Sequence, residues 1–208
     1  MGPRNLAVID YGTGNLKSVV KAFEFLGAQV SLIQEPKAFK GIDAVVFPGQ
    51  GSYDQCMTRL RKSGLDDALR SWIEEDRPFF GICLGLQVLF ESSEEGDLPG
   101  LGLFKGKVKR FRLSQELKIP HMGWNNVSWN LPSGHWVCKH LENQDQFYFV
   151  HSYRVVTDDP RLTTFTTDYG GIFTSGVSYS NCLATQFHPE KSQSKGMRLY
   201  RNFLENID

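Results

Sequence analysis

The residues best suited to do chemistry are Cys83 and the short segment around it, Gly81-Ile82-Cys83-Leu84-Gly85. An apolar run precedes this segment and an apolar pattern with helical spacing follows it, so we expect a strand, a sharp turn and a helix. A residue at the apex of such a turn has a strained backbone, and the flanking glycines remove Cβ atoms that would clash there. A thiol at a helix N-terminus is favoured as thiolate. The segment predicts a cysteine nucleophile; the alternative is a small side chain buried under a helix.

A thiol nucleophile also needs a base, and His188 has the most suitable surroundings of the five histidines. It lies in the segment Gln186-Phe187-His188-Pro189-Glu190. Pro189 favours an extended backbone at His188, and in an extended segment residues i and i+2 point to the same side. We therefore expect Glu190 to hold the His188 imidazole in one tautomer. The alternative is a histidine at a strand end beside a solvated glutamate.

Strands and helices alternate in the first half of the chain. We expect strands at residues 6–10, 28–33, 43–47 and 79–82, and helices at 16–26, 60–75 and over the apolar pattern after Cys83. This order predicts an α/β fold with an open, largely parallel sheet flanked by helices on both faces. In such sheets function collects at the C-terminal ends of the strands, where Cys83 is expected to lie.

The pattern changes from about Lys105 to short runs of strand type separated by turns. We expect strands at residues 108–111, 147–150, 162–166, 172–179 and 182–187, and a final helix at 197–207. Residues 91–103 are expected to form a loop beside the site. The chain shows no repeat or linker, so we expect one domain over residues 1–208 with an antiparallel, β-rich C-terminal portion.

Composition excludes several classes of function. The 208 residues carry 23 basic and 23 acidic side chains, without the basic excess of a nucleic-acid or membrane-surface partner. No stretch approaches the length of a membrane span, and residues 1–5 lack the apolar core of a signal peptide. The cysteines form no C-x-x-C pair, which argues against zinc or a disulfide framework and suits a reducing compartment. We expect a cytoplasmic protein without metal or cofactor.

Three segments together carry a resemblance to a known family. The turn at residues 81–87, the segment His188-Pro189-Glu190 and the loop Phe47-Pro48-Gly49-Gln50-Gly51-Ser52 resemble class I (triad-type) glutamine amidotransferases, whose fold is flavodoxin-like. Residues 9–16, 119–125 and 147–153 further resemble the glutaminase subunits that serve imidazole glycerol phosphate synthase in histidine biosynthesis. The resemblance extends from about Leu6 to the C-terminus, and Pro120-His121-Met122-Gly123-Trp124-Asn125 is its most specific part.

The resemblance implies roles for individual residues. Cys83, His188 and Glu190 would hydrolyse L-glutamine to glutamate and ammonia. The implied oxyanion hole consists of backbone N–H groups of Gly49, Gln50, Gly51 and Leu84. The implied contacts to glutamine are Gln87, Glu95, Ser152 and Tyr153. Gln50 departs from the family, which usually has a small apolar residue there: either its side chain alters a loop equilibrium or only its backbone N–H matters.

The resemblance also implies a partner chain. Ammonia in water at neutral pH is protonated and lost as a nucleophile, so it must reach a synthase by a shielded route. The implied partner is the (β/α)8-barrel cyclase subunit, in a heterodimer that makes imidazole glycerol phosphate and aminoimidazole carboxamide ribotide. The implied interface residues are Asn15, Met122 and Trp124, although the last two could equally pack in a core. The alternatives are a glutaminase of another pathway, such as anthranilate, pyridoxal phosphate or aminodeoxychorismate synthesis, and a non-catalytic regulatory subunit.

Overall fold

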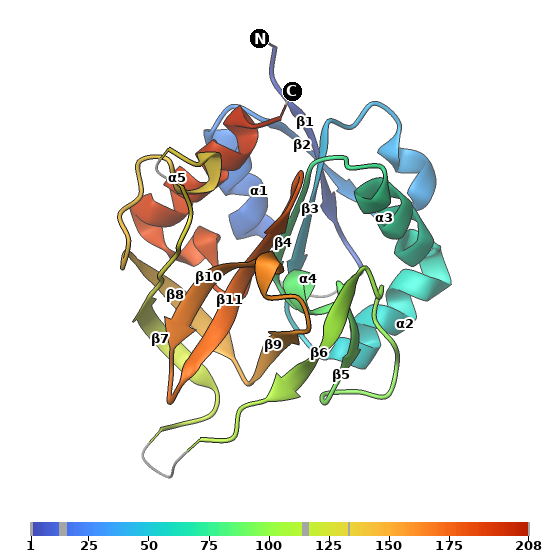
Figure 1. The fold of residues 1–208 in the computed structure, drawn as a ribbon. Coiled ribbons are helices and arrows are strands. Elements are labelled where there is room, and N and C mark those ends of the chain that lie inside the picture. Colours follow the sequence, from blue (N-terminus) through green and yellow to red (C-terminus); the bar gives the residue numbers. More distant parts are fainter. Residues whose placement is uncertain (1, 13–15, 114–116, 133, 208) are drawn as a thin grey trace.

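The computed structural model describes residues 2–12, 16–113, 117–132 and 134–207 (Figure 1). The strands are β1 (Asn5–Ile9), β2 (Gln29–Ile33), β3 (Ala44–Gly49), β4 (Phe79–Cys83), β5 (Phe90–Ser93), β6 (Phe104–Arg110), β7 (His121–Asn126), β8 (Gln146–His151), β9 (Tyr153–Thr157), β10 (Thr163–Asp168), β11 (Ile172–Tyr179) and β12 (Cys182–Thr185). The helices are α1 (Leu16–Phe25), α2 (Tyr53–Ser63), α3 (Leu65–Glu74), α4 (Leu84–Gln87) and α5 (Gln193–Glu205), with 3₁₀ turns at Pro36–Phe39, Trp136–Cys138, Pro160–Leu162 and Pro189–Lys191.

One mixed sheet runs through the described part of the chain in the order β2-β1-β3-β4-β12-β11-β9-β6-β5, and β10 pairs with β11. The first five strands of this order are mutually parallel, as the alternation of strands and helices predicts. Strands β12, β11, β9 and β6 pair antiparallel. Strands β7 and β8 form a separate antiparallel pair. The α/β fold with an antiparallel C-terminal portion is therefore confirmed.

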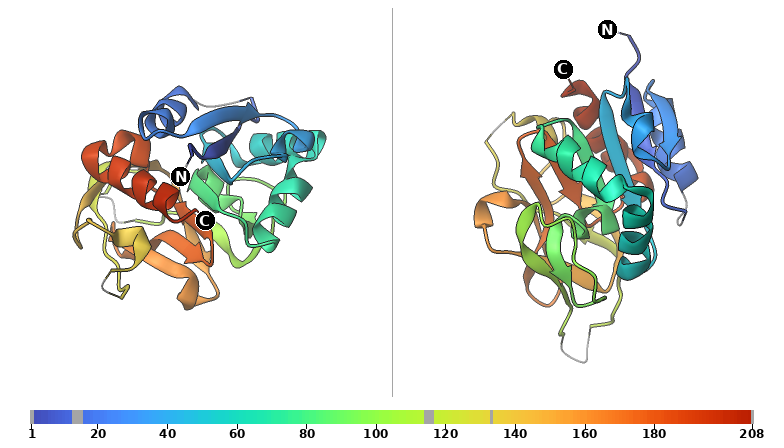
Figure 2. Two further views of the ribbon diagram at one scale, coloured as in Figure 1. Left: turned by 90° about the horizontal axis from the view of Figure 1, so that it is seen from above. Right: turned by 90° about the vertical axis from the view of Figure 1, so that its right-hand side faces the viewer.

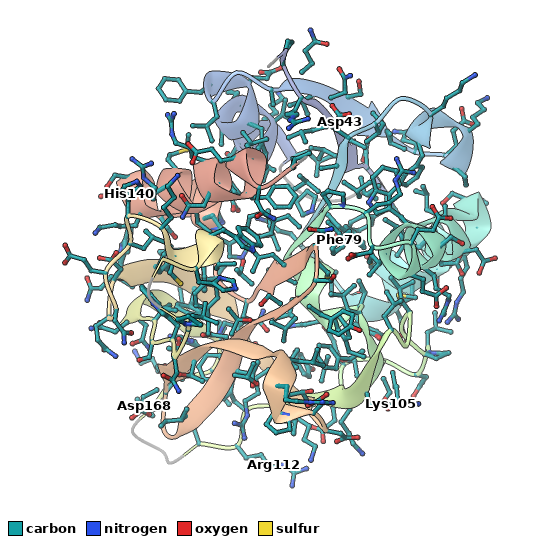
Figure 3. The ribbon with its side chains drawn as sticks, turned by 45° about the horizontal axis from the view of Figure 1, so that its top comes forward. Asp43, Phe79, Lys105, Arg112, His140 and Asp168 are labelled. Atoms are coloured by element: carbon teal, nitrogen blue, oxygen red, sulfur yellow. The ribbon has the colours of Figure 1, made fainter. Side chains whose placement is uncertain are left out.

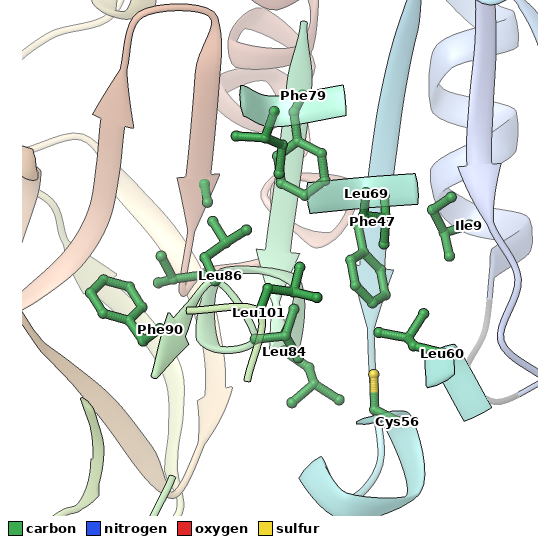
Figure 4. Packing of buried hydrophobic residues seen from close by; sticks show 14 of the residues in the cluster. Ile9, Phe47, Cys56, Leu60, Leu69, Phe79, Leu84, Leu86, Phe90 and Leu101 are labelled. Atoms are coloured by element: carbon green, nitrogen blue, oxygen red, sulfur yellow. The ribbon is translucent and has the colours of Figure 1, made fainter. Parts of the chain in front are cut away.

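The central parallel strands β1, β3, β4 and β12 are almost entirely buried because both faces of the sheet are covered there. Alternate residues of β1 enter two different cores: Ala7 and Ile9 pack toward α2 and α3, and Leu6 and Val8 toward α1 and α5. Figure 1 shows α1 and α5 on one side of these strands and α2 and α3 on the other, and the view from above in Figure 2 shows the same separation. In Figure 4, Phe47 and Phe79 of the sheet lie among Leu60, Leu69 and Leu84. These two cores fix the strand ends that carry the site.

Two helices occupy the region predicted as one helix at residues 60–75. The first begins earlier, at Tyr53, where the Ser52 hydroxyl caps it by accepting the Gln55 N–H at 3.4 Å. Gly64 then separates the helices with a φ of 74°, a left-handed conformation that glycine adopts without steric cost. The predicted start was wrong, since the helical period already begins at Tyr53, with Cys56, Met57 and Leu60 buried on the same face. The region expected to be largely helical is helical apart from the break at Gly64.

The helix after Cys83 is much shorter than its apolar pattern predicts. Helix α4 ends at Gln87, and Phe90 already begins β5. The carbonyl groups that a longer helix would use are bonded to later residues instead. The Val88 carbonyl accepts the Leu101 N–H at 2.7 Å, and the Leu89 carbonyl accepts the Phe104 N–H at 3.1 Å. The loop expected at residues 91–103 accordingly begins as a strand. Tertiary hydrogen bonds override the helical spacing here.

Strands β7 and β9 were not predicted. Strand β7 reads His-Met-Gly-Trp-Asn-Asn, a polar and glycine-containing run whose strand character comes from its pairing with β8. Charged residues such as Lys105, Arg112 and Asp168 lie at the edge of the molecule in Figure 3, whereas Phe79 lies inside. None of the described helices is both long enough and apolar enough to cross a membrane.

Candidate active site

Cys83 ends β4 and directly precedes α4, as the strand–turn–helix prediction requires. Its φ of 54° and ψ of −102° lie in a region that non-glycine residues rarely adopt. A Cβ at Gly85 would collide with the Phe47 carbonyl, and one at Gly81 with the carbonyl of Gly85. The two glycines let the turn pass this close to the sheet, so the expected reason for their presence is confirmed.

Strand register brings three segments to the thiol. Strand β4 lies between β3 and β12 in the sheet, with Gly49 of β3 opposite Cys83 and Thr185 of β12 opposite Ile82. Because these strands are parallel, their C-terminal ends meet at one edge. The loop after Gly49 and the residues after Thr185, including His188, therefore converge beside Cys83.

His188 and Glu190 form a buried pair. The distance from His188 Nδ1 to Glu190 Oε1 is 2.8 Å, and both side chains are almost inaccessible. The contact predicted from sequence is present, but its geometric reason was wrong, because Glu190 lies in a 3₁₀ turn and not in extended chain. Tyr200 donates its hydroxyl to Glu190 Oε2 at 3.2 Å and thereby orients the carboxylate.

The backbone of His188 is fixed to β8. Its N–H donates to the Tyr148 carbonyl at 2.9 Å, and its carbonyl accepts the Ser192 hydroxyl at 2.6 Å. Ser192 Oγ in turn accepts the Tyr148 N–H at 3.0 Å. This closed ring of hydrogen bonds holds the imidazole in place without using its Nε2.

The imidazole of His188 bonds Glu190 through Nδ1 and lines the same cavity as Cys83. Among the described residues its buried Nε2 has no hydrogen-bond partner. Burial would lower the pKa of His188, but the nearby charge of a Cys83 thiolate and the hydrogen bond to Glu190 outweigh burial and raise that pKa above its usual value. The raised pKa of His188 favours the protonated imidazolium form of the ring at the edge of the cavity.

A cavity of about 300 Å³ opens over this pair. Its lining contains most of the residues implied by the resemblance: Gly49, Gln50, Gly51, Cys83, Leu84, Gln87, Glu95, Tyr153 and His188. Ser152 does not line it, and its carbonyl accepts the Phe111 N–H at 3.1 Å. Val150, His151 and Lys191 complete the lining. Neither Val150 nor Lys191 was predicted from sequence as a site residue. The only sequence feature that could have indicated Lys191 is its position directly after His188-Pro189-Glu190, and no feature indicates Val150.

The loop after β3 lies in the cavity wall, but one of its backbone groups is already occupied. The Gln50 N–H donates to the Tyr11 hydroxyl at 3.1 Å, and the same hydroxyl donates to the Gln50 carbonyl at 3.0 Å. Tyr11 is buried and packs edge-on against Phe47. In this conformation the Gln50 N–H is committed to Tyr11 and not to an oxyanion at Cys83.

Glu95 is a half-buried carboxylate in the cavity wall. Burial raises its pKa, and the neighbouring Asp54 carboxylate adds to that effect, while the Tyr53 backbone N–H opposes it. A carboxylate in this setting is stabilised by a cationic ligand. Such a ligand would have to carry its positive charge to the end of the cavity where Glu95 lies.

His151 lines the cavity as the end of a buried polar chain. Its Nδ1 lies 2.7 Å from the Tyr153 carbonyl and must donate to it, so its Nε2 accepts from His121 Nδ1 at 2.9 Å. His121 Nε2 then accepts from Asn125 at 3.2 Å. Burial lowers the pKa of His121 to about 4 and that of His151 to about 3. Both rings are neutral at pH 7, which suits a scaffold more than a second base.

The outer face of the β7–β8 pair is apolar and exposed next to the cavity. Met122 is 61% and Trp124 44% exposed, so neither is a core residue. They lie opposite Val150 and Tyr148 of β8 in the register, and Val150 lines the cavity. The exposed face of β7 and β8 is therefore continuous with the mouth of the cavity. Asn15, the third residue expected at an interface, lies outside the described residues.

Comparisons with known proteins agree with this geometry. The family described as "Glutamine amidotransferase class-I" matches residues 7–207. The chain is 46% identical over 204 residues to the imidazole glycerol phosphate synthase subunit HisH of Synechococcus sp. (strain JA-3-3Ab), covering 97% of this chain and 94% of that protein. It is 48% identical over 200 residues to the HisH subunit of Thermosynechococcus vestitus, covering 96% and 95%.

Solved structures share the fold at lower sequence identity. The structure titled "Structure of PurLQS from Thermotoga maritima" superposes with a TM-score of 0.80 at 18% identity, with full coverage of both chains. A crystal structure of a glutamine amidotransferase superposes with a TM-score of 0.75 at 21% identity, covering 96% of this chain and 97% of that one.

Proposed function

The chain belongs to the class-I glutamine amidotransferase family, and from that premise we propose that it is the glutaminase subunit of an imidazole glycerol phosphate synthase in histidine biosynthesis. Near full-length identity of 46–48% to HisH subunits supports the pathway. The observation that carries the chemistry is the 2.8 Å contact of His188 with Glu190 at the cavity that contains Cys83. We also propose that residues 1–208 act as one domain.

The proposed reaction begins with attack of the Cys83 thiolate on the side-chain carbonyl carbon of L-glutamine. The tetrahedral intermediate places a negative charge on the former carbonyl oxygen, next to the backbone of Leu84 and the Gly49–Gly51 loop. One well-placed N–H donor at such an oxyanion contributes about 3 kcal/mol. His188 gives its proton to the departing ammonia and leaves a thioester on Cys83.

Hydrolysis of the thioester completes the cycle. His188, now neutral, removes a proton from an attacking water, and collapse of the second tetrahedral intermediate releases glutamate and regenerates the thiolate–imidazolium pair. Glu190 remains ionised throughout and stabilises the imidazolium, while Tyr200 keeps its carboxylate oriented.

We place the substrate with its α-ammonium toward Glu95 and its amide toward Cys83. A positive charge beside Glu95 offsets the cost of burying that carboxylate. Gln87 and Tyr153 line the wall between the two ends. Ser152 remains a predicted contact that would require its backbone to turn from Phe111.

We propose that the synthase partner, a (β/α)8-barrel cyclase subunit, docks on the exposed face of β7 and β8. This surface is continuous with the cavity, because Met122 and Trp124 are exposed apolar side chains and their neighbour Val150 lines the cavity. A partner on this surface would close the cavity mouth and receive ammonia before water protonates it.

The test is glutamate release from glutamine, measured for the isolated chain and for its complex with the cyclase subunit of the same organism and its ribonucleotide substrate. We expect a low rate alone and a strongly increased rate in the complex. If the chain binds the cyclase subunit but releases no glutamate in any combination, it is a non-catalytic subunit. Activation by the synthase of another pathway instead would contradict the assignment to histidine biosynthesis.

A further inference from the structure

The side chain of Gln186 is a fully buried amide that contacts the proposed nucleophile and that the mechanism above does not use. Its Nε2 lies 3.5 Å from Cys83 Sγ, within reach of a hydrogen bond to sulfur. Its Oε1 accepts a hydrogen bond from Gln87 Nε2 at 3.1 Å. Gln186 thus connects the thiol to a residue of the cavity wall.

The direction of this amide chain follows from its far end. Gln87 Nε2 also lies 3.4 Å from the Tyr153 carbonyl, which can only accept, so the Gln87 atom there must be the nitrogen. The same nitrogen faces Gln186, whose facing atom must therefore be its oxygen. The NH₂ group of Gln186 therefore faces the Cys83 sulfur, and in this hydrogen bond Nε2 donates and Sγ accepts.

Strand register holds Gln186 in this position. It follows Thr185 of β12, the register partner of Ile82, and is therefore adjacent to Cys83 across the sheet. Its backbone N–H donates to the Ser175 carbonyl at 2.8 Å. The side chain contacts Cys83 from a rigid strand end and approaches sulfur from the sheet, not from the cavity where substrate binds.

We infer that Gln186 is a positioning residue of this site: its N–H donates to the Cys83 sulfur, favours the thiolate over the thiol, and fixes where the thiolate lies for attack. Gln87 supports it by fixing the orientation of the amide. A hydrogen bond donated to an ionised group is stronger than one to its neutral form, so removing the donor weakens the thiolate selectively. The inference rests on the proposed function for its biological meaning, but not for its test.

The test measures the thiolate directly. Cys83 is alkylated by iodoacetamide over a range of pH, and the Cys83→Ala protein supplies the blank for Cys56, Cys138 and Cys182. The charged or titratable groups facing the thiol are His188, His151, Lys191 and Glu95 in the cavity wall, with Glu190 behind His188. They are unchanged in Gln186→Met, so a shift in the pH midpoint of that variant reports the loss of the Gln186 donor.

Two substitutions of Gln186 are compared with a matched control. Gln186→Met removes the donor at similar size and should move the alkylation midpoint up by about one pH unit, since a hydrogen bond to a charged group is of that order. Gln186→Glu places a carboxylate against the sulfur and should move it further. Gln87→Met should produce a smaller shift in the same direction. Asn202→Leu, which removes a buried amide that donates to the Val137 and Lys139 carbonyls, should leave the midpoint unchanged.

Two results would overturn the inference. One is an unchanged midpoint in Gln186→Met protein that still unfolds cooperatively in urea. The other is an equal shift in Asn202→Leu, which would show a general loosening of the fold. Both are independent of whether the wild-type chain hydrolyses glutamine, so failure of the proposed function would be seen separately.

Discussion

The chemistry depends on a small number of contacts around one strained residue. Cys83 has a left-handed φ of 54°, and the imidazole beside it is fixed by its backbone to β8 and by its Nδ1 to Glu190. Burial of His188 would favour the neutral ring, and the two neighbouring anionic groups reverse that preference. The raised pKa of His188 therefore favours an imidazolium beside Cys83, as the proposed mechanism requires.

Replacing each member of the His188–Glu190 pair should have unequal effects. His188→Asn removes the proton carrier of both half-reactions and should lower kcat for glutamine hydrolysis by about 10²–10⁴-fold. Glu190→Gln retains an oxygen that can accept from Nδ1 and should cost less. Steady-state glutamate release in the presence of the cyclase subunit measures both. Equal losses below about tenfold would place the base elsewhere in the cavity.

At the scale of elements, the loop after β3 is the part of the site that is not arranged for catalysis. The Tyr11 hydroxyl holds both the N–H and the carbonyl of Gln50. An oxyanion donor at this position requires the Gly49–Gln50 peptide to rotate away from Tyr11, and the residue before that peptide bond, Gly49, has no Cβ to restrict its ψ. The loop is thus expected to be a switch between a resting and an active state.

Tyr11→Phe tests this switch. Loss of the two hydrogen bonds should raise glutamate release by the isolated chain about threefold to tenfold, which corresponds to a net contribution of about 1 kcal/mol. The rate of the fully activated complex should change little, because Tyr11 has already released the loop there. An unchanged rate of the isolated Tyr11→Phe protein would show that Tyr11 does not restrain the loop.

Gln50→Val separates the side chain from the backbone at the same position. If the Gln50 side chain biases the loop, this substitution should alter the rate of the isolated chain more than that of the activated complex. The same two glutamate-release assays measure it. Identical rates for wild type and variant in both states would show that only the backbone of Gln50 matters.

Sequence predicted the elements whose signal is local. The turn at Cys83 and the apolar strands β1, β3 and β4 were identified because glycines and apolar runs mark them. Strand β7 was missed because its strand character comes from β8, and α4 was overextended because Leu101 and Phe104 capture the backbone after Gln87. The same limit applies in the site: Gln186 contacts Cys83 through the β4–β12 register, which no spacing along the chain reveals.

At the scale of the whole molecule, two buried neutral histidines make stability depend on pH. Their pKa values in the folded chain are about 4 for His121 and about 3 for His151, against about 6.5 in an unfolded chain. Between these values the unfolded chain binds protons that the folded chain does not. The free energy of unfolding should therefore fall as pH falls below about 6.5, by up to about 1.4 kcal/mol per pH unit for each histidine.

Urea unfolding between pH 7 and pH 5 measures this slope. His151→Gln should reduce the slope even if it lowers stability at pH 7, because one of the two histidines no longer titrates. His140→Asn, at an exposed position, is the control and should retain the wild-type slope. A slope that His151→Gln leaves unchanged would show that other groups cause the loss of stability.

The exposed face of β7 and β8 should account for partner binding. Trp124→Ala should weaken the affinity for the cyclase subunit by about tenfold or more, as expected for an aromatic residue at the centre of an interface. Phe25→Ala removes an aromatic side chain that is 81% exposed on α1 and should have no effect. Calorimetric titration of each variant with the cyclase subunit gives both affinities, and equal affinities would place the interface elsewhere.

The measurement that tests the central claim most directly is product formation by the complex containing Cys83→Ala. The thiol is proposed to serve only the release of ammonia, and cyclisation is proposed to occur on the partner. We therefore predict that glutamine-dependent synthesis of imidazole glycerol phosphate is abolished, while synthesis from added ammonium salts at raised pH remains at the wild-type rate. Loss of both activities in a variant that still binds the cyclase subunit, or survival of the glutamine-dependent one, would contradict the account.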